Sequence, residues 1–334
     1  MASRSTATAV PVRYRRKALS RQGVGTGRSI EFPGCHPVHL RRDEIEGHEG
    51  RFEYWEADTE TAWTLREPTS LYHERPSQRL ARLTERIAAF RGSPIETFGA
   101  ADLLVRNARG ERHRIMQADQ MVYLHPERDQ PDGAAVEVGE EVLPDVVLEA
   151  DLTTDVRRGK LWLYESWGFP EVWVEVPDRR LPSSPRGRPA GLSIYLLCSG
   201  SYSEADVSQA FPGWSAADVH RALNERAMSL ETIEALRRVG RALGEQEGTT
   251  PEHDPVLGAE RREGRREGHL AGRLEVLTEL LRHTLLAKGI QISPRLDAKA
   301  EALVHAPLDA VMAAASECRD EEDFLRRADA LLRN

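Results

Sequence analysis

The stretch from Pro144 to Asp178 constrains the fold more than any other part of the sequence, because two short apolar runs flank a helical pattern there. The runs DVVLEA and EVWVEV have the length typical of buried strands. The segment TTDVRRGKLWLYESWG between them predicts a helix that Thr154 or Asp155 caps and Gly168 ends. A strand, a helix and a second strand in succession indicate an α/β fold.

The segments on either side extend this core. Residues 50–65 alternate aromatic and polar positions and predict a hairpin, while residues 77–90 carry leucines and isoleucine at helical spacing. Residues 93–124 predict one short strand and then two more around the turn NARG, and GLSIYLLCSGSY predicts a further strand. We therefore expect an α/β core in which a mixed sheet is flanked by helices.

Composition divides the chain into three parts. No acidic residue precedes Glu31, and the basic segment of residues 1–30 predicts a disordered tail. The α/β core is expected over residues 31–214, and an α-helical C-terminal region over residues 215–334. Leucines recur at helical spacing from Leu274 onward, which favours packing onto the core or self-association as a dimer.

The bulk properties exclude several classes of protein. None of the 334 residues belongs to an apolar stretch long enough to span a membrane. The three cysteines, Cys35, Cys198 and Cys318, are far apart and odd in number, which predicts reduced thiols in a cytoplasmic protein. The net charge of -8 argues against broad coating of nucleic acid, but it is compatible with a small, acidic, metal-loaded site.

Carboxylates occur in the predicted strands, where burial without a partner is costly. Strand alternation places Asp145 and Glu149 on one face, with Asp151 on that face if the strand continues. Asp119 lies on a neighbouring predicted strand. Acids that converge at one end of a sheet need a cation between them, and Mg²⁺ takes carboxylate ligands together with water and substrate phosphate. Asp145 is about 13 Å from Glu149 along the strand, so it more plausibly marks the strand entrance than a ligand.

A lysine follows these acids on the predicted helix. Lys160 comes after the first strand, and Tyr164 lies one turn further along the same helical face. A lysine beside a metal site can hold a water or neutralise charge that develops on a phosphoryl oxygen. Asp, Glu and Lys around Mg²⁺ thus form a workable set for phosphodiester hydrolysis, with Tyr164 as an accessory residue.

The segments ADQMVYL, PDVVLEA and KLWLYESWGFPEVWVEVPD resemble the Uma-two family of restriction-endonuclease-like proteins (formerly a domain of unknown function), within the PD-(D/E)XK nuclease superfamily. The resemblance covers roughly residues 50–215. It implies a restriction-endonuclease-like fold and an endonuclease that uses Mg²⁺ (or Mn²⁺) to hydrolyse the phosphodiester bonds of DNA. Relatives often carry a histidine where His73 stands, which makes His73 a structural or peripheral candidate.

By this resemblance, Asp119 and Glu149 correspond to the metal-binding acids, and the backbone carbonyl of Ala150 is a further ligand. The superfamily's lysine two residues after the glutamate is here Asp151, which becomes an accessory acid. The family often carries its lysine on the following helix, which points to Lys160. An alternative stays open: a non-catalytic nucleic-acid-binding or assembly protein that retains the fold. The missing lysine at position 151 and the acidic net charge favour it.

Overall fold

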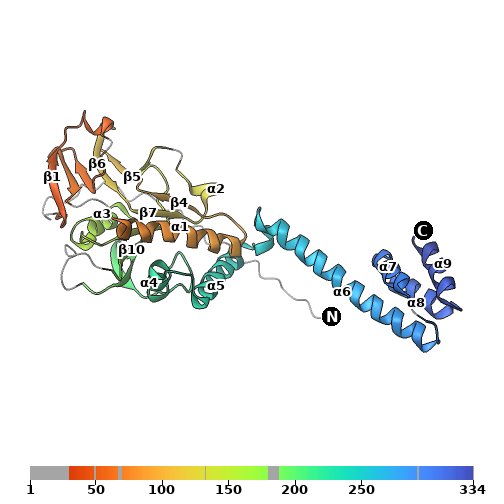
Figure 1. Ribbon diagram of the computed structural model, residues 1–334. Coiled ribbons are helices and arrows are strands. Elements are labelled where there is room, and N and C mark those ends of the chain that lie inside the picture. Colours follow the sequence, from red (N-terminus) through yellow and green to blue (C-terminus); the bar gives the residue numbers. More distant parts are fainter. Residues whose placement is uncertain are drawn as a thin grey trace, which may run out of the picture. The chain divides into compact units, whose positions relative to one another are not determined.

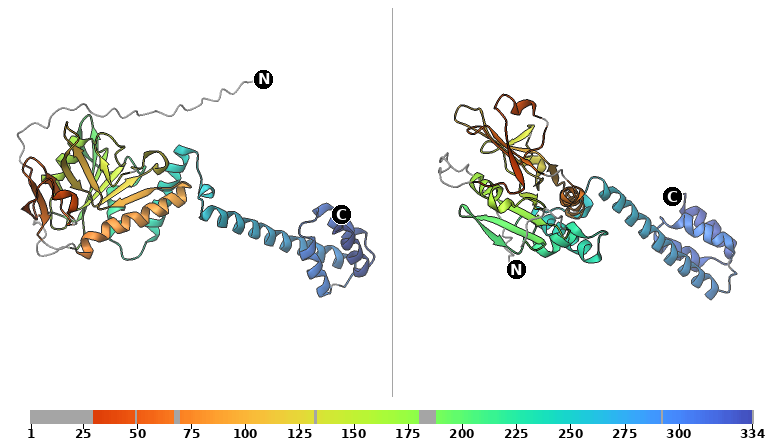
Figure 2. Two further views of the ribbon diagram at one scale, coloured as in Figure 1. Left: turned by 90° about the horizontal axis from the view of Figure 1, so that it is seen from above. Right: turned by 60° about the vertical axis from the view of Figure 1, so that its left-hand side comes forward.

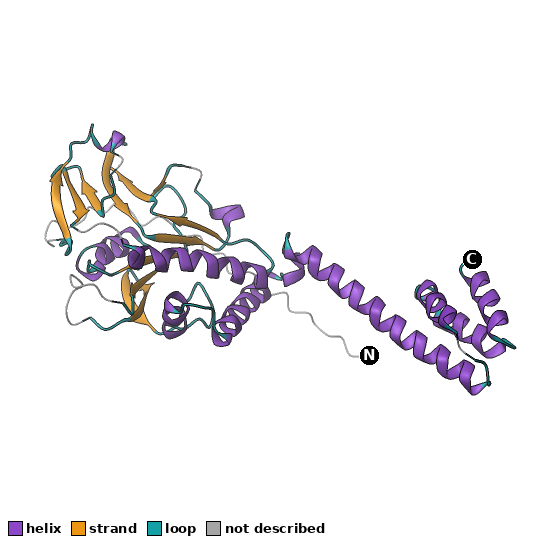
Figure 3. Ribbon diagram, in the orientation of Figure 1, coloured by secondary structure: helices purple, strands orange, loops and turns teal. Residues whose placement is uncertain are grey.

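A computed structural model of the chain describes residues 30–48, 50–66, 70–131, 133–179, 188–291 and 293–333. The chain divides into two compact units, residues 1–254 and residues 255–334. Strands occur only in the first unit among the described residues, and the second consists of helices (Figure 3). The α/β class expected from the sequence is therefore confirmed. The predicted basic tail lies outside the described residues except for Ile30. Residues 180–187, which are rich in proline and arginine, also lie outside them.

The first unit contains two six-stranded sheets rather than the single mixed sheet that we expected (Figure 1). Sheet A has the order β1-β3-β2-β6-β5-β8, and sheet B has the order β12-β11-β10-β9-β7-β4. The strands of sheet A are β1 (Cys35–His39), β2 (Tyr54–Glu56), β3 (Thr61–Leu65), β5 (Asp102–Arg106), β6 (Arg112–Gln117) and β8 (Ala135–Glu137). Those of sheet B are β4 (Glu96–Gly99), β7 (Gln120–Tyr123), β9 (Val146–Ala150), β10 (Glu171–Val176), β11 (Gly191–Cys198) and β12 (Ser201–Ala205).

The passage from sheet A to sheet B explains why one predicted strand became two. The segment after the NARG turn forms β6 and β7, which belong to different sheets and are separated by Ala118 and Asp119. The Ala118 amide leaves the β6 ladder and donates to the Ala101 carbonyl, at 3.3 Å. The hydrophobic pattern continues across this break, so it gave no sign that the strand changes sheets.

Helices cover both faces of sheet B. These helices are α1 (Leu71–Arg91), α3 (Lys160–Trp167), α4 (Ala216–Asn224) and α5 (Leu230–Glu247), with a short α2 (Pro126–Asp129) elsewhere. Helices α1, α4 and α5 share a buried cluster with Leu148 and Trp173, whereas α3 packs on the opposite face with Val147 and Val172. β9 and β10 are parallel, as a strand–helix–strand unit requires. Figure 2 shows α1 and α5 side by side from two further directions.

The boundary that we expected near residue 215 is wrong, because α4 and α5 belong to the first unit. Their apolar residues complete the cluster under sheet B: Val219, Leu223, Leu236 and Val239 are at most 1% exposed. Composition changes at residue 215 because the strands end there, but a helix can be as much a part of an α/β core as a strand.

Truncation provides a test of this boundary. A chain that ends at Asp254 is expected to keep the cooperative unfolding of the first unit, because none of its buried hydrophobic clusters draws on later described residues. A chain that ends at Trp214 loses seven buried apolar side chains of α4 and α5. Since each large core truncation costs roughly 2–5 kcal/mol, that chain should not fold. Circular dichroism during urea unfolding distinguishes the outcomes, and a folded 1–214 chain would refute the revised boundary.

The second unit has a hydrophobic core of its own. It comprises α6 (Leu257–Ala287), α7 (Pro294–Leu303), α8 (Leu308–Glu317) and α9 (Glu321–Leu331). Leu277, Leu281 and Leu285 of α6 turn inward to pack with Leu296 and Phe324. These three leucines of the predicted pattern are buried within this unit, whereas Leu280 is exposed. No helix among the described residues is long and apolar enough to cross a membrane.

Candidate functional site

A group of buried charged side chains lies where the chain passes from sheet A to sheet B. We call it the lysine–carboxylate cluster and define it as Glu53, Asp119, Glu149 and Lys160. Glu53 immediately precedes β2 in sheet A, Asp119 lies between β6 and β7, and Glu149 lies in β9 of sheet B. Lys160 begins α3. All four side chains are at most 7% exposed, so the cluster is largely shielded from solvent.

The Lys160 ammonium joins three elements. Its Nζ donates to Glu149 Oε2 at 2.8 Å, to Glu53 Oε2 at 2.8 Å and to the Gln117 carbonyl at 2.7 Å. An ammonium group has three protons, so its hydrogen-bonding capacity is fully used. The helix lysine that we expected to reach the acid on the preceding strand therefore does so, and it links that acid to a second carboxylate from the other sheet.

Close backbone packing determines where α3 begins and hence where Lys160 points. A Cβ atom on Gly159 would lie 2.4 Å from the Glu31 carbonyl oxygen, so only glycine allows the segment at residues 30–31 to cross there. Helix α3 starts directly after it, at Lys160, and not at the Thr154 or Asp155 cap that we expected. Thr154 instead donates to Asp151. Gly168 ends the helix in the left-handed region, as expected, with φ of 84°.

Tyr164 holds the other oxygen of Glu149. Its hydroxyl donates to Glu149 Oε1 at 2.5 Å, one helical turn beyond the Lys160 contact with Oε2. The expectation that both side chains lie on one face of the helix is therefore met. With a separate donor on each carboxylate oxygen, Glu149 has a single well-determined orientation.

Asp119 is held by a different set of groups. Its Oδ2 accepts from the Ala150 amide at 2.8 Å, which ties it to the end of β9, and its Oδ1 accepts from Arg51 Nη2 at 2.6 Å. Arg51 also binds Glu74 at 2.9 Å. The buried His73 ring lies beside this acid, with Nε2 at 3.7 Å from Asp119 Oδ2. His73, a peripheral candidate in the sequence, is thus in the first turn of α1 next to Asp119.

The charges of the cluster shift the pKa values of its members. Burial raises the pKa of Glu149 far above that of an ordinary glutamate; Lys160 opposes the rise, and Asp119 and Glu53 add to it. For Lys160, burial acts to lower the pKa, but the attraction of Glu149, Glu53 and Asp119 outweighs it and raises the pKa. Lys160 is therefore a stable ammonium at neutral pH and does not act as a base. Lys160 pairs with Glu53 and Glu149, and Arg51 supplies the positive charge beside Asp119.

Two predicted accessory acids lie apart from the cluster. Asp151 accepts from Thr154 Oγ1 and from the Val156 amide, both at 3.0 Å, and forms an ion pair with Arg188. These contacts occupy it in the turn after β9. Asp145 lies at the opposite end of β9, where its Oδ2 accepts from the Leu124 amide at 2.8 Å. It marks the entrance of the strand, as we expected from the distance along it.

The sequence reasoning missed Glu53 and Arg51. Both lie in GRFEYWEAD, which the alternation of aromatic and polar residues identified only as part of a hairpin. Glu53 comes about a hundred residues before Lys160, and no local sequence pattern relates an acid beside sheet A to a helix that packs on sheet B. The signal that could have identified Glu53 is its position between Phe52 and Tyr54 in a predicted strand, because a buried carboxylate there needs a partner.

The donor types fit a hard divalent cation, although the side chains are not gathered for one. Two carboxylates and a backbone carbonyl suffice for Mg²⁺ when waters complete its shell. Asp119, Glu149 and Ala150 lie together through the contact between Asp119 and the Ala150 amide. Among the described residues, however, no three or more His, Cys, Asp or Glu side chains are arranged to hold a metal. The cations Arg51 and Lys160 contact the acids instead.

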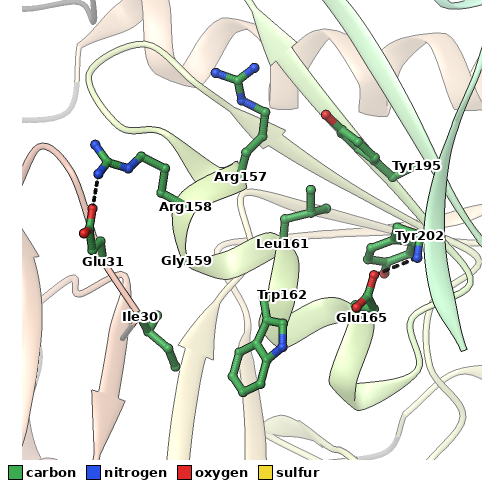
Figure 4. Close-up of a pocket in the computed structure, with 10 residues that line it drawn as sticks. All are labelled: Ile30, Glu31, Arg157, Arg158, Gly159, Leu161, Trp162, Glu165, Tyr195 and Tyr202. Atoms are coloured by element: carbon green, nitrogen blue, oxygen red, sulfur yellow. Dashed lines mark hydrogen bonds and ion pairs between the residues drawn. The ribbon is translucent and has the colours of Figure 1, made fainter. Parts of the chain in front are cut away.

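A depression of about 400 Å³ lies on the outer side of α3, away from the cluster. Figure 4 shows Leu161, Trp162 and Glu165 of α3 on its wall, with Tyr195 and Tyr202 beside them. The side chains that α3 directs inward are Lys160, Leu163 and Tyr164. The depression and the cluster therefore use different faces of one helix. Its polar groups are paired: Glu165 accepts from the Tyr202 amide, and Arg158 contacts Glu31.

No family model and no curated protein matches this sequence. Among solved structures, the chain is similar to that of a proposed nuclease belonging to DUF820 from Anabaena variabilis. The two sequences are 12% identical, and the similarity covers 55% of this chain and 99% of that chain, with a TM-score of 0.34. At this TM-score, the likeness is not evidence for a shared activity.

Proposed function

We propose that this protein is a metal-dependent endonuclease that hydrolyses phosphodiester bonds of DNA. The observation that carries the proposal is the contact between the Lys160 ammonium and Glu149, with Asp119 held at the end of the same strand. A nuclease of this type needs two acids for a cation and a lysine within reach of them. The resemblance of the surrounding motifs to the Uma-two family supports the same reading.

In this proposal, Asp119, Glu149 and the Ala150 carbonyl would hold Mg²⁺ or Mn²⁺, which would polarise the phosphate and acidify a water. Lys160 remains protonated and neutralises charge that develops on the phosphoryl oxygens. Glu53 and Tyr164 position Lys160 and Glu149, respectively, through the contacts at 2.8 and 2.5 Å. Asp151 and Asp145 take no part, because each is used in a local backbone contact.

A second function is supported by a specific observation. Each acid of the lysine–carboxylate cluster already has a cation or hydroxyl partner, and the position of the superfamily lysine is occupied by Asp151, which binds Arg188. A closed ion network of this kind suits a protein that keeps the nuclease fold for binding or assembly. The two functions are distinguished by whether the protein cleaves DNA when a divalent metal is added.

Cleavage assays with an Asp119→Asn variant test the proposal. Wild-type protein incubated with plasmid and with single-stranded DNA should nick or linearise DNA with Mg²⁺ or Mn²⁺ and lose this activity with a chelator. Asp119→Asn keeps an acceptor for the Ala150 amide but removes the ligand charge, so cleavage should fall by roughly 10²–10³-fold. Asp129→Asn, at the half-buried last residue of α2, is the matched control. Binding without cleavage in every condition would select the second function.

A further inference from the structure

Two exposed arginines lie over one tyrosine at the start of α1. The Arg179 guanidinium is 4.5 Å from the centroid of the Tyr72 ring, and the Arg75 guanidinium is 5.6 Å from it. Such contacts keep an arginine extended over the aromatic ring without neutralising its charge. Neither guanidinium has a carboxylate within 4.0 Å among the residues that the structure describes. Two concentrated positive charges are therefore presented to solvent.

These charges lie at the edge of sheet B where the lysine–carboxylate cluster lies. β9 and β10 are parallel, with Glu175 opposite Ala150, and Arg179 follows β10 after two residues. The first turn of α1 reaches the same edge, because His73 lies beside Asp119. Tyr72 is the residue before His73 in the chain. The arginine pair thus flanks the cluster from the face of the sheet opposite α3.

The positive surface continues along α1. Arg82 and Arg86 follow Arg75 by seven and eleven residues, close to two and three turns, so the three lie on one side of the helix. All three are exposed, and neither Arg82 nor Arg86 has an ion-pair partner in the described part of the chain. From Arg75 to Arg86 the rise is about 16 Å, which matches the axial rise of roughly five base pairs of B-DNA. The neighbouring Arg79 is instead directed to Glu225 and the Ala222 carbonyl.

We infer that Arg75, Arg82, Arg86 and Arg179, which we call the arginine face, bind the phosphate backbone of DNA. This inference deepens the proposed function and rests on it for the choice of DNA as the ligand. The lysine–carboxylate cluster is acidic and the protein carries a net charge of -8, so a polyanion needs local cations to approach that edge. Arginine suits this task because its guanidinium pairs with phosphate and stays charged. Contacts of this kind fix the position of the strand and carry no sequence preference.

The test measures binding of a labelled DNA duplex in the presence of a metal chelator. Fluorescence anisotropy reports the affinity over a range of salt concentrations. The Arg75→Glu/Arg179→Glu double variant should bind at least about tenfold more weakly. Its plot of log affinity against log salt should be shallower by about two, because each lost phosphate contact removes ~0.9 from the slope. A purely structural role for these arginines would not change the slope in this way.

The matched control is Arg109→Glu/Arg128→Glu, which makes the same charge change on the β5–β6 turn and on α2, two elements that are not part of the arginine face. It should leave the slope within about 0.5 of wild type. Equal slopes for the two double variants, or a wild type that binds no duplex, would overturn the inference. Cleavage assays on the same proteins separate the two ideas. If the protein cleaves DNA but the double variant at Arg75 and Arg179 leaves the salt slope of binding unchanged, only the inference about the arginine face is refuted. If binding depends on these arginines but no cleavage occurs, only the proposed nuclease activity is refuted.

Discussion

Replacing Glu149 with glutamine is expected to reduce Mg²⁺-dependent cleavage of DNA by at least roughly 10³-fold. Glutamine keeps the shape of the side chain and an acceptor for Tyr164, but it lacks the charge that holds a cation. The fold should survive, because Lys160 keeps its contacts with the Glu53 carboxylate and the Gln117 carbonyl and is not left as an unpaired buried charge. The measurement is the rate of plasmid nicking, with circular dichroism to establish that the variant is folded.

The matched control for this variant is Asp145→Asn. Both acids lie at the ends of β9, and a scan for the proline–aspartate motif would pair them as one site. Asp145 accepts from the Leu124 amide at the strand entrance, and asparagine preserves that bond. Cleavage by Asp145→Asn should therefore stay within about threefold of wild type. Equal losses in both variants, or undiminished cleavage by Glu149→Gln, would contradict the assignment of the site.

Replacing Lys160 with methionine is expected to destabilise the first unit by about 3–5 kcal/mol at neutral pH in the absence of metal. Methionine fills similar space, but it leaves Glu53 and Glu149 buried together without the ammonium that both contact at 2.8 Å. A loss of this size is a large share of the total stability of a domain. Urea unfolding measures it.

Second-site changes and pH identify the cause of that loss. Adding Glu53→Gln and Glu149→Gln to Lys160→Met removes the uncompensated charges and should recover most of the stability. Lys299→Met, which breaks a surface pair with Asp329, is the control and should cost no more than about 1 kcal/mol. Failure of the triple variant to recover stability would mean that Lys160 acts through packing and not through charge.

The pH dependence has a definite sign. The pKa of Glu149 is raised in the folded state, so its contribution to stability is fully present below the ordinary glutamate pKa and is lost as pH rises toward the folded value of about 8. The pKa of Lys160 is also raised, so its contribution persists through neutral pH and is lost only in strong alkali. Lys160 lowers the pKa of Glu149, so its removal raises that pKa further, and the cost of Lys160→Met should grow as the pH rises above about 8.

The elements of the α/β core were predictable because each has a local pattern. The run at Val146–Ala150, the helix that contains Lys160 and Tyr164, and the strand at Glu171–Val176 all follow from the spacing of apolar residues. Spacing along one helix also predicted that Lys160 and Tyr164 share a face, and they bind the two oxygens of Glu149. These relations extend over a few residues, which is the range at which backbone geometry alone relates side chains.

Long-range relations were not predictable in this way. Glu53 comes 107 residues before Lys160, and their contact exists only because the segment before β2 in sheet A packs against α3. The boundary at Asp254 depends on α4 and α5 burying their apolar faces against sheet B, which the change of composition near residue 215 concealed. Asp151 had the spacing of an accessory acid, but a turn after β9 directed it to Val156 and Arg188.

The sequence by itself determined the strands β9 and β10 with a helix between them, and which acids and lysine are candidates for chemistry. Backbone periodicity and the cost of burying charge act locally, so both can be judged from neighbouring residues. Only the tertiary structure decided which charges meet. The chain changes sheets at Asp119, and Gly159 lets another segment cross so that Lys160 enters the interior between two carboxylates. Those contacts depend on packing between distant segments, where the partner of each buried charge is selected by shape as well as by sign.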